Sequence, residues 1–325
     1  MLMGDQMKRR SFIVGLACAA AWPLSARGQT ALRRFRVGIL DTSARRGNAN
    51  FTALEQTLRA RGYVEGQNLA FEYRSADGRN DSFPALAAEL ASLNVDVIVT
   101  RGTPAALAAK AATATIPVIM AAAGDPVAIA RGARNLTGFG ANLQGAEAKR
   151  VEILKALLPN AARLAALMNL SNPSRQSEWS TIAAAAQALG IAPQVLDART
   201  LADIERAFGA AASQHADALV VGSDTVVQTN QRRVVELAAA HRLPAIYTFR
   251  DFVDAGGLIS YGVGLPDLYR RAAASVDAIL RGGRPSDLPI EPATGSELVI
   301  NIRAAKALGL AVPDSLIAHA DAVIE

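Results

Sequence analysis

The chain has 325 residues, of which 34 are Lys or Arg and 29 are Asp or Glu, and its single cysteine excludes an intramolecular disulfide. Four of the basic residues and one acidic residue lie in the first 28 positions, so the remainder holds 30 basic and 28 acidic residues, a net charge of +2. This near-neutral balance argues against nucleic acid as a partner. The length is sufficient for two lobes, each with its own core.

The N-terminal segment has the features of an export signal. Residues 7–28 contain a basic start, an apolar run of about eleven residues and a small-x-small cleavage pattern that ends at Gly28. The run is too short to span a bilayer, which takes roughly 20 residues, and Gly15 is a poor match for a lipidation signal at Cys18. We therefore expect a periplasmic protein, cleaved near Gly28. The sequence RRSFI fits the twin-arginine pattern, but ordinary Sec export stays open.

From residue 33 onward, short β-branched runs alternate with alanine-rich segments at helical spacing, which is typical of βαβ units around a parallel sheet. A first helix is expected to open at the capping box Thr52-x-x-Glu55 and to close at Gly62. The expected strands of this first block are residues 35–40, 69–74, 96–100, 117–121 and 135–140, with helices at 51–62 and 82–93.

A second series follows with the same alternation. Its expected strands are residues 163–169, 192–198, 217–223 and 243–249, separated by helices at 177–190, 201–214 and 230–242 after a leading helix at 146–159, and a further strand, a long helix and the segment 296–301 close the chain.

These patterns predict an α/β protein with two doubly wound parallel-sheet lobes and a ligand cleft between them. We expect lobe 1 to comprise residues 33–143 and about 258–288, and lobe 2 residues 146–257 and about 290–325. The chain would then cross between lobes near Leu143, Asp251 and Pro289.

Three strand ends are followed by a polar residue and a proline, as in Thr103-Pro104, Asp125-Pro126 and Asn172-Pro173. Thr, Asp and Asn are good N-cap residues, and proline suits the first helical position because no donor is needed there. Free N–H groups and the positive end of the helix dipole make such termini able to bind anions. Since ligands of open parallel sheets lie beyond the carboxyl ends of the strands, we expect these helices to open into one cleft.

The same reasoning selects the candidate ligand-binding residues. Thr103 either caps its helix or offers its hydroxyl to a ligand carboxylate. Asp125 is either a helix cap or a partner for a ligand ammonium group, and Asp224 is either a solvent-exposed turn residue or a second such partner. Tyr247 offers a ring and a hydroxyl, but core packing is the alternative. The complete predicted set is Asp41, Thr42, Ser43, Thr103, Asp125, Asn172, Ser174, Ser223, Asp224, Tyr247 and Thr248.

Two aromatic residues outside that set have structural interpretations. Trp179 is the only tryptophan after the signal, and we expect it to pack on a helix face rather than to stack on a ligand. Tyr261 lies at a strand end near an expected lobe crossing, where Gly256, Gly257 and Gly262 would supply the backbone freedom of a hinge.

Recurring enzyme motifs are missing from the sequence, which contains no GxxxxGK[ST], HExxH or GxSxG. Its three histidines, His215, His241 and His319, fall on or beside expected helices rather than at strand ends. We therefore predict no catalytic residue, no metal site and no cofactor. Two alternatives remain: an exported α/β enzyme that uses Asp125 or Asp224 as acid or base, and a ligand-sensing accessory protein for a membrane receptor.

The motifs RGTPAAL, GDPV, NLTGF, NPSR, HRLPAIYTFRDFVDAGGLISYGV, DLYRRAAASVDAILRG and ELVINIRAAKALGL follow one another along the chain. In this order they resemble the ABC transporter substrate-binding family that includes TrpX-like aromatic amino-acid binding proteins. The resemblance implies a type I periplasmic-binding fold whose lobes close on a small ligand and dock on an ABC permease with its ATPase at the inner membrane. We thus expect a monomeric receptor that spans no membrane and reversibly binds a small polar solute, with an aromatic or branched amino acid as the candidate.

Overall fold

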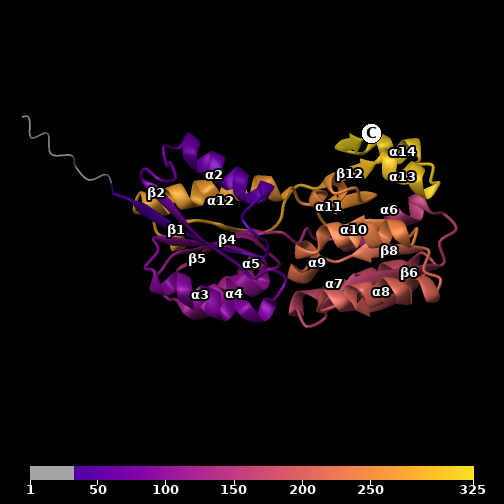
Figure 1. Ribbon diagram of the computed structural model, residues 1–325, viewed down its shortest axis with the longest axis horizontal. Helices are drawn as coiled ribbons and strands as arrows, with labels where there is room; N and C mark the ends of the chain where they lie inside the picture. Colours follow the sequence, from indigo (N-terminus) through magenta and orange to yellow (C-terminus); the bar gives the residue numbers. More distant parts are fainter. Residues whose placement is uncertain (1–32) are drawn as a thin grey trace, which may run out of the picture. The chain divides into compact units, whose positions relative to one another are not determined.

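The computed structural model describes residues 33–325, apart from the side chains of residues 173 and 174, and two sheets organise it (Figure 1). The expected export signal lies outside the described residues. Among the residues that are described, no helix is both long and apolar enough to cross a bilayer.

The first sheet has six strands in the order β11-β5-β4-β3-β1-β2, all of them parallel. Helices α2 and α12 cover one face, and α3, α4 and the short α5 cover the other (Figure 1). The bounds are β1 Phe35–Asp41, α2 Ala49–Ala60, β2 Leu69–Ser75, η1 Asn80–Ser82, α3 Phe83–Ser92, β3 Val97–Arg101, α4 Thr103–Ala112, β4 Val118–Ala123, α5 Pro126–Ala130, β5 Leu136–Gly140, α12 Leu265–Leu280, η2 Pro285–Asp287 and β11 Ile290–Glu291.

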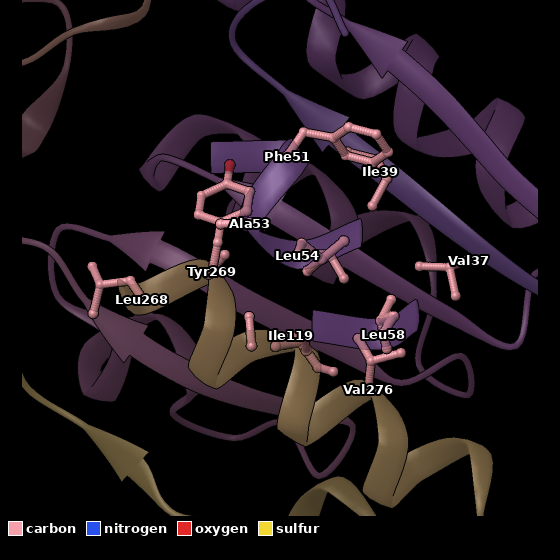
Figure 2. Packing of buried hydrophobic residues seen from close by; sticks show 14 of the residues in the cluster. Val37, Ile39, Phe51, Ala53, Leu54, Leu58, Ile119, Leu268, Tyr269 and Val276 are labelled. Carbon is pink, nitrogen blue, oxygen red and sulfur yellow. The ribbon is translucent and has the colours of Figure 1, made fainter. Parts of the chain in front are cut away.

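Helix α12 comes late in the sequence but completes the core of this first lobe. Its buried positions include Leu268, Ala272, Val276 and Ile279, and this spacing of three and four residues places them on one face. Figure 2 shows this face packed against Leu54 and other residues of α2 and of the sheet. Burial of a large apolar side chain contributes roughly 1.5–3 kcal/mol, so α12 is an integral part of the lobe.

The start of α2 differs from the predicted capping box. Asn48 is the N-cap, because its side-chain oxygen accepts hydrogen bonds from the backbone N–H groups of Asn50 and Phe51, both at 3.1 Å. Thr52 already lies within the helix and donates its hydroxyl to the carbonyl of Asn48 at 3.0 Å. The prediction at Thr52 was wrong because Asn48 competes as a cap one turn earlier.

The second sheet has seven strands in the order β13-β12-β10-β9-β8-β6-β7, and only the pairing of β10 with β12 is antiparallel. The bounds are α6 Ala146–Leu157, β6 Arg163–Met168, α7 Pro173–Ala188, β7 Ala192–Asp197, α8 Leu201–Ser213, β8 Ala218–Val221, α9 Thr225–Thr229, α10 Gln231–Ala240, β9 Ala245–Tyr247, α11 Arg250–Asp254, β10 Ile259–Gly262, β12 Glu297–Asn301, α13 Ile302–Leu308, α14 Asp314–Ala318 and β13 Ala322–Ile324.

Two strands pair differently from the expected division of the chain. Strand β10 lies between β9 and β12, so residues 259–262 belong to the second sheet, and the chain crosses after them rather than near Asp251. Strand β11 pairs with β5 of the first sheet, so Ile290 and Glu291 belong to lobe 1.

Both sheets share one topological feature that positions the functional site. The first strand of each lobe lies between the second and the third, in the orders β2-β1-β3 and β7-β6-β8. In the first lobe, the connections after β1 and β3 therefore run to opposite sides of the sheet, and in the second lobe those after β6 and β8 do the same. Between each such pair of connections lies the crevice in which ligands of open parallel sheets bind. The predicted fold class, two parallel-sheet α/β lobes, is confirmed.

Candidate functional site

A small cavity is lined by residues from the carboxyl ends of strands in both sheets. Its volume is about 40 Å³, enough for a few water molecules. In the first lobe its lining follows β1, β3, β4 and β5; in the second it follows β6, β8 and β9. The two topological crevices thus face one enclosed space.

Asp224 provides a buried carboxylate in this cavity. It follows β8 and caps α9, and its side-chain Oδ1 accepts hydrogen bonds from Asn169 Nδ2 at 2.9 Å and from the Val226 N–H at 3.3 Å. Its other oxygen accepts from Asn172 Nδ2 at 2.9 Å. Asp224 is only 3% exposed, and no basic side chain of the described residues forms an ion pair with it. A buried carboxylate with neutral partners alone is suited to bind a cation.

Thr103 lines the cavity at the start of α4, although it is not the cap of that helix. The N-cap is Gly102, whose φ of +85° favours glycine, and no side chain caps the helix there. The Thr103 hydroxyl instead accepts a hydrogen bond from the N–H of Gly124 at 3.1 Å, which ties the end of β4 to the start of α4. The small residues Ala122 and Ala123 line the cavity beside this contact.

Arg101 ends β3 and is 6% exposed on the same cavity. Its two terminal nitrogens lie 3.7 Å from Asp41 Oδ1 and 3.9 Å from Asp251 Oδ2. Burial opposes its charge, but the negative charge of Asp41, followed by Tyr269 and Asp251, leaves the pKa of Arg101 raised. Arg101 is thus a charged group that two carboxylates compensate.

Arg175, in the first turn of α7, is a cavity residue that sequence reasoning missed. It forms an ion pair with Glu178, and its Nη2 donates to Asn142 Oδ1 at 3.4 Å. Within the described part of the chain, its buried Nε has no hydrogen-bond partner. The signal was present in the NPSR motif, but an arginine in a first helical turn is more typical of a solvent-exposed face.

Phe249 and Leu265 were also missed. Phe249 follows β9, Leu265 begins α12, and both are buried and line the cavity. They give an otherwise polar space an apolar wall. Both are apolar residues, and the sequence alone does not distinguish a core position from a cavity wall.

The predicted residues Thr42, Ser223 and Asn172 line the cavity, together with Thr103 and Asp224. Asn172 donates its side-chain amide to Asp224 there. Thr42 connects the lobes, because its carbonyl accepts from the Thr229 hydroxyl at 2.9 Å.

Other predicted residues lie elsewhere. Asp41 is fully buried behind the cavity, where it accepts the Tyr269 hydroxyl at 2.8 Å. Ser43 faces a separate hollow beside Arg46. Asp125 is exposed and caps α5 through the Ala128 N–H at 2.9 Å.

Tyr247 and Thr248 belong to the interior of the second lobe. The Tyr247 ring stacks on Phe252 at 4.9 Å, and its burial raises the pKa of the phenol. Thr248 donates its hydroxyl to the carbonyl of Val221 at 3.3 Å. Trp179 packs half-buried against the lobe core, and the Ser174 side chain lies outside the described residues.

Comparisons with known proteins agree with this architecture. A family model described as "ABC transporter substrate binding protein" matches residues 46–324. A "Tyrosine-binding protein" of Clostridioides difficile strain R20291 is 25% identical over 260 residues, which cover 78% of this chain and 75% of that protein.

Solved structures resemble the whole described fold. A conserved domain protein from Vibrio cholerae is 28% identical with a TM-score of 0.81, and an ABC domain from Streptococcus pneumoniae in complex with L-Trp is 24% identical with a TM-score of 0.80. In both cases the match covers 90% of this chain and 100% of the other. These findings confirm the resemblance noted in the sequence: the chain belongs to the ABC transporter substrate-binding protein family.

Proposed function

We propose that this protein is a periplasmic receptor that binds one amino acid, as a zwitterion, in the cavity between its lobes. The observation that carries the proposal is the buried carboxylate of Asp224, which faces the cavity and whose donors among the described residues are two side-chain amides and one backbone N–H. Burying a carboxylate without a cation is unfavourable, whereas a ligand ammonium would compensate its charge with charge-assisted hydrogen bonds. Asn169 and Asn172 hold both oxygens in place for that contact.

An aromatic side chain is the ligand feature we favour. Phe249 and Leu265 supply apolar surface next to the charged and polar groups. A ring bound against Phe249 would gain both buried area and an aromatic contact. The names of two relatives support the choice, since one is a tyrosine-binding protein and another was solved with L-Trp.

Binding is proposed to involve separation and closure of the lobes. A cavity of about 40 Å³ does not admit an amino acid, so the lobes must part to load it. Thr229 donates to the Thr42 carbonyl at 2.9 Å, and Asn50 Nδ2 lies 3.4 Å from Asp251 Oδ2, so contacts between lobes hold the present arrangement. A ligand that contacts both lobes would favour a closed form whose cavity is larger than that of the present arrangement. The closed monomer would then dock on an ABC permease and its ATPase.

Isothermal titration calorimetry with the twenty L-amino acids tests the proposal. We expect one ligand per chain, recovered chemically unchanged, with an aromatic amino acid binding tightest. Asp224→Ala should weaken that ligand by about 2 kcal/mol or more, roughly 30-fold, because it removes the buried charge partner.

Asp125→Ala is the matched control, because it removes an exposed aspartate that also caps a helix after a strand. We expect it to leave affinity unchanged. Equal affinity of the Asp224→Ala variant and the parent protein would contradict the ammonium assignment, and turnover of the ligand would favour an exported enzyme instead.

A further inference from the structure

Three charged side chains form a buried cluster beside the cavity, where α6 meets α7. Arg150 and Glu178 have side chains 3% exposed, and that of Arg175 is 5% exposed. Arg150 Nη1 lies 3.3 Å from Glu178 Oε1, and the other Glu178 oxygen pairs with Arg175. Two guanidinium groups therefore share one buried carboxylate.

The cluster is short of one negative charge. Burial, opposed mainly by Glu178, lowers the pKa of Arg150, and the positive charge of Arg175 acts in the same direction. Glu147 helps to compensate Arg150, but it is partly exposed and hence screened by solvent. Arg150 also donates from Nε to the carbonyl of Tyr261 at 2.9 Å, so its position is fixed away from the cavity. The excess charge is thus available to the cavity through Arg175.

Arg175 also has an unused donor. Its Nη1 is engaged by Glu178 and its Nη2 by Asn142, but its buried Nε meets no partner among the residues that the structure describes. A buried donor on a cation costs free energy when no acceptor meets it. Since Arg175 lines the cavity, a ligand acceptor can satisfy this nitrogen.

We infer that Arg175 binds the ligand carboxylate and so selects amino acids over amines. The inference rests on the proposed function and names a second half of the same site. Asn172, which holds Asp224, stands three residues before Arg175 at the start of α7, so the acidic and basic groups lie at one helix end. The ammonium and carboxylate of an amino acid are attached to the same carbon, and they need partners that are close together.

Arg101 with the start of α4 is the competing carboxylate subsite. The buried Asp41 already compensates Arg101, and the partly exposed Asp251 adds a weaker, solvent-screened negative charge. An additional carboxylate there would be repelled by both, whereas at Arg175 it would correct a positive excess. The balance of buried charge therefore favours Arg175.

A ligand pair that differs only in the carboxylate tests the assignment. L-tryptophan and tryptamine, or the tightest-binding amino acid and its decarboxylated amine, are titrated into the parent protein and into Arg175→Gln. The parent should prefer the amino acid by at least about 30-fold, and Arg175→Gln should lose most of this preference while its affinity for the amine changes little. Arg175→Lys should retain part of the preference, because it keeps the charge but not the planar donor set.

Three further measurements separate the outcomes. Arg206→Gln removes an exposed arginine on α8 and should leave the preference intact. In a third variant, Arg101→Gln, the same preference for the amino acid over the amine is measured. If Arg101→Gln loses this preference while both Arg175 variants keep it, the assignment is overturned and the subsite at α4 is supported. Binding of no amino acid by the parent protein would overturn both this inference and the proposed function. If Arg175→Gln does not fold, as judged by its melting curve, the Lys variant decides alone, and an unchanged preference there overturns the assignment.

Discussion

At the scale of single residues, two buried aspartates have opposite surroundings. Asp41 accepts the Tyr269 hydroxyl at 2.8 Å and faces Arg101 at 3.7 Å, so its charge is compensated within the protein. The donors that Asp224 meets in the described part of the chain are neutral. Asp41 therefore stabilises the first lobe, whereas Asp224 is free to take a ligand cation.

Tyr269→Phe should separate these two roles. The variant removes the hydroxyl donor to Asp41 without changing the packing of the ring, and loss of a partner by a buried charge costs about 1–3 kcal/mol. Burial, and next the charge of Asp41, raises the pKa of Tyr269, so its hydroxyl donates throughout the neutral range. Urea denaturation should show the lower free energy of unfolding, while amino-acid affinity stays close to that of the parent. Unchanged stability would contradict the structural role of Asp41.

The sequence indicated which residues stand at strand ends, but it did not predict whether their side chains point into the cavity or into the lobe core. Asp224 and Tyr247 both follow or end apolar strands, and both were selected for that reason. Asp224 lines the cavity, but Tyr247 points into the lobe core, where it stacks on Phe252. Side chains alternate between the two faces of a strand, so an error of one position reverses the assignment. Arg175 was missed because its burial depends on Glu178 and on the packing of α6, which no local pattern reveals.

At the scale of elements, Asp277 joins α12 to the end of α2. Its carboxylate accepts hydrogen bonds from Tyr63 and from Arg61, both at 2.9 Å, and pairs with Arg281 at 2.6 Å. Burial acts against the charged form, but Arg281, Tyr63 and Arg61 together hold the pKa of Asp277 below its usual value. A carboxyl with a depressed pKa in the folded state stabilises the fold above its unfolded pKa of about 3.9 and loses that contribution as the pH falls further.

Asp277→Asn should therefore lower the free energy of unfolding at pH 7 by about 1–2 kcal/mol and make it depend less on pH below about 4. Urea denaturation between pH 3 and pH 7 measures both effects. Asp287→Asn is the control, because that carboxylate pairs with Arg284 on the exposed surface, where ion pairs contribute little. This account would be contradicted if the free energy of unfolding of Asp277→Asn fell below pH 4 as steeply as that of the parent protein.

Most elements were predictable because their periodic patterns are local. The sheet to which β10 and β11 belong was not predictable, because it depends on which strand of which sheet each of them pairs with. Strand β11 has only two residues, too few to show a pattern, and β10 is followed by α12, which packs on the other lobe. The division at residues 258–264 and 290–291 thus follows from long-range pairing.

At the scale of the whole described fold, two sheets with the same internal strand order bring their crevices to one cavity. Each lobe contributes groups that the other lacks: the small residues and helix start of the first, and the Asp224 and Arg175 groups of the second. Polar contacts such as Thr229 with the Thr42 carbonyl join the lobes, and Phe249 of the second lobe packs in the apolar cluster of the first. We expect a bound ligand to add further contacts that favour closure.

Native mass spectrometry of the protein purified from its own host is the most direct test of the central claim, that an amino acid is bound between the lobes by Asp224. The account predicts one bound small molecule per chain, identified after acid release as an amino acid and lost from Asp224→Ala but retained by Asp125→Ala. A bound sugar or other solute without an amino group, or an amino acid retained equally by Asp224→Ala, would contradict it.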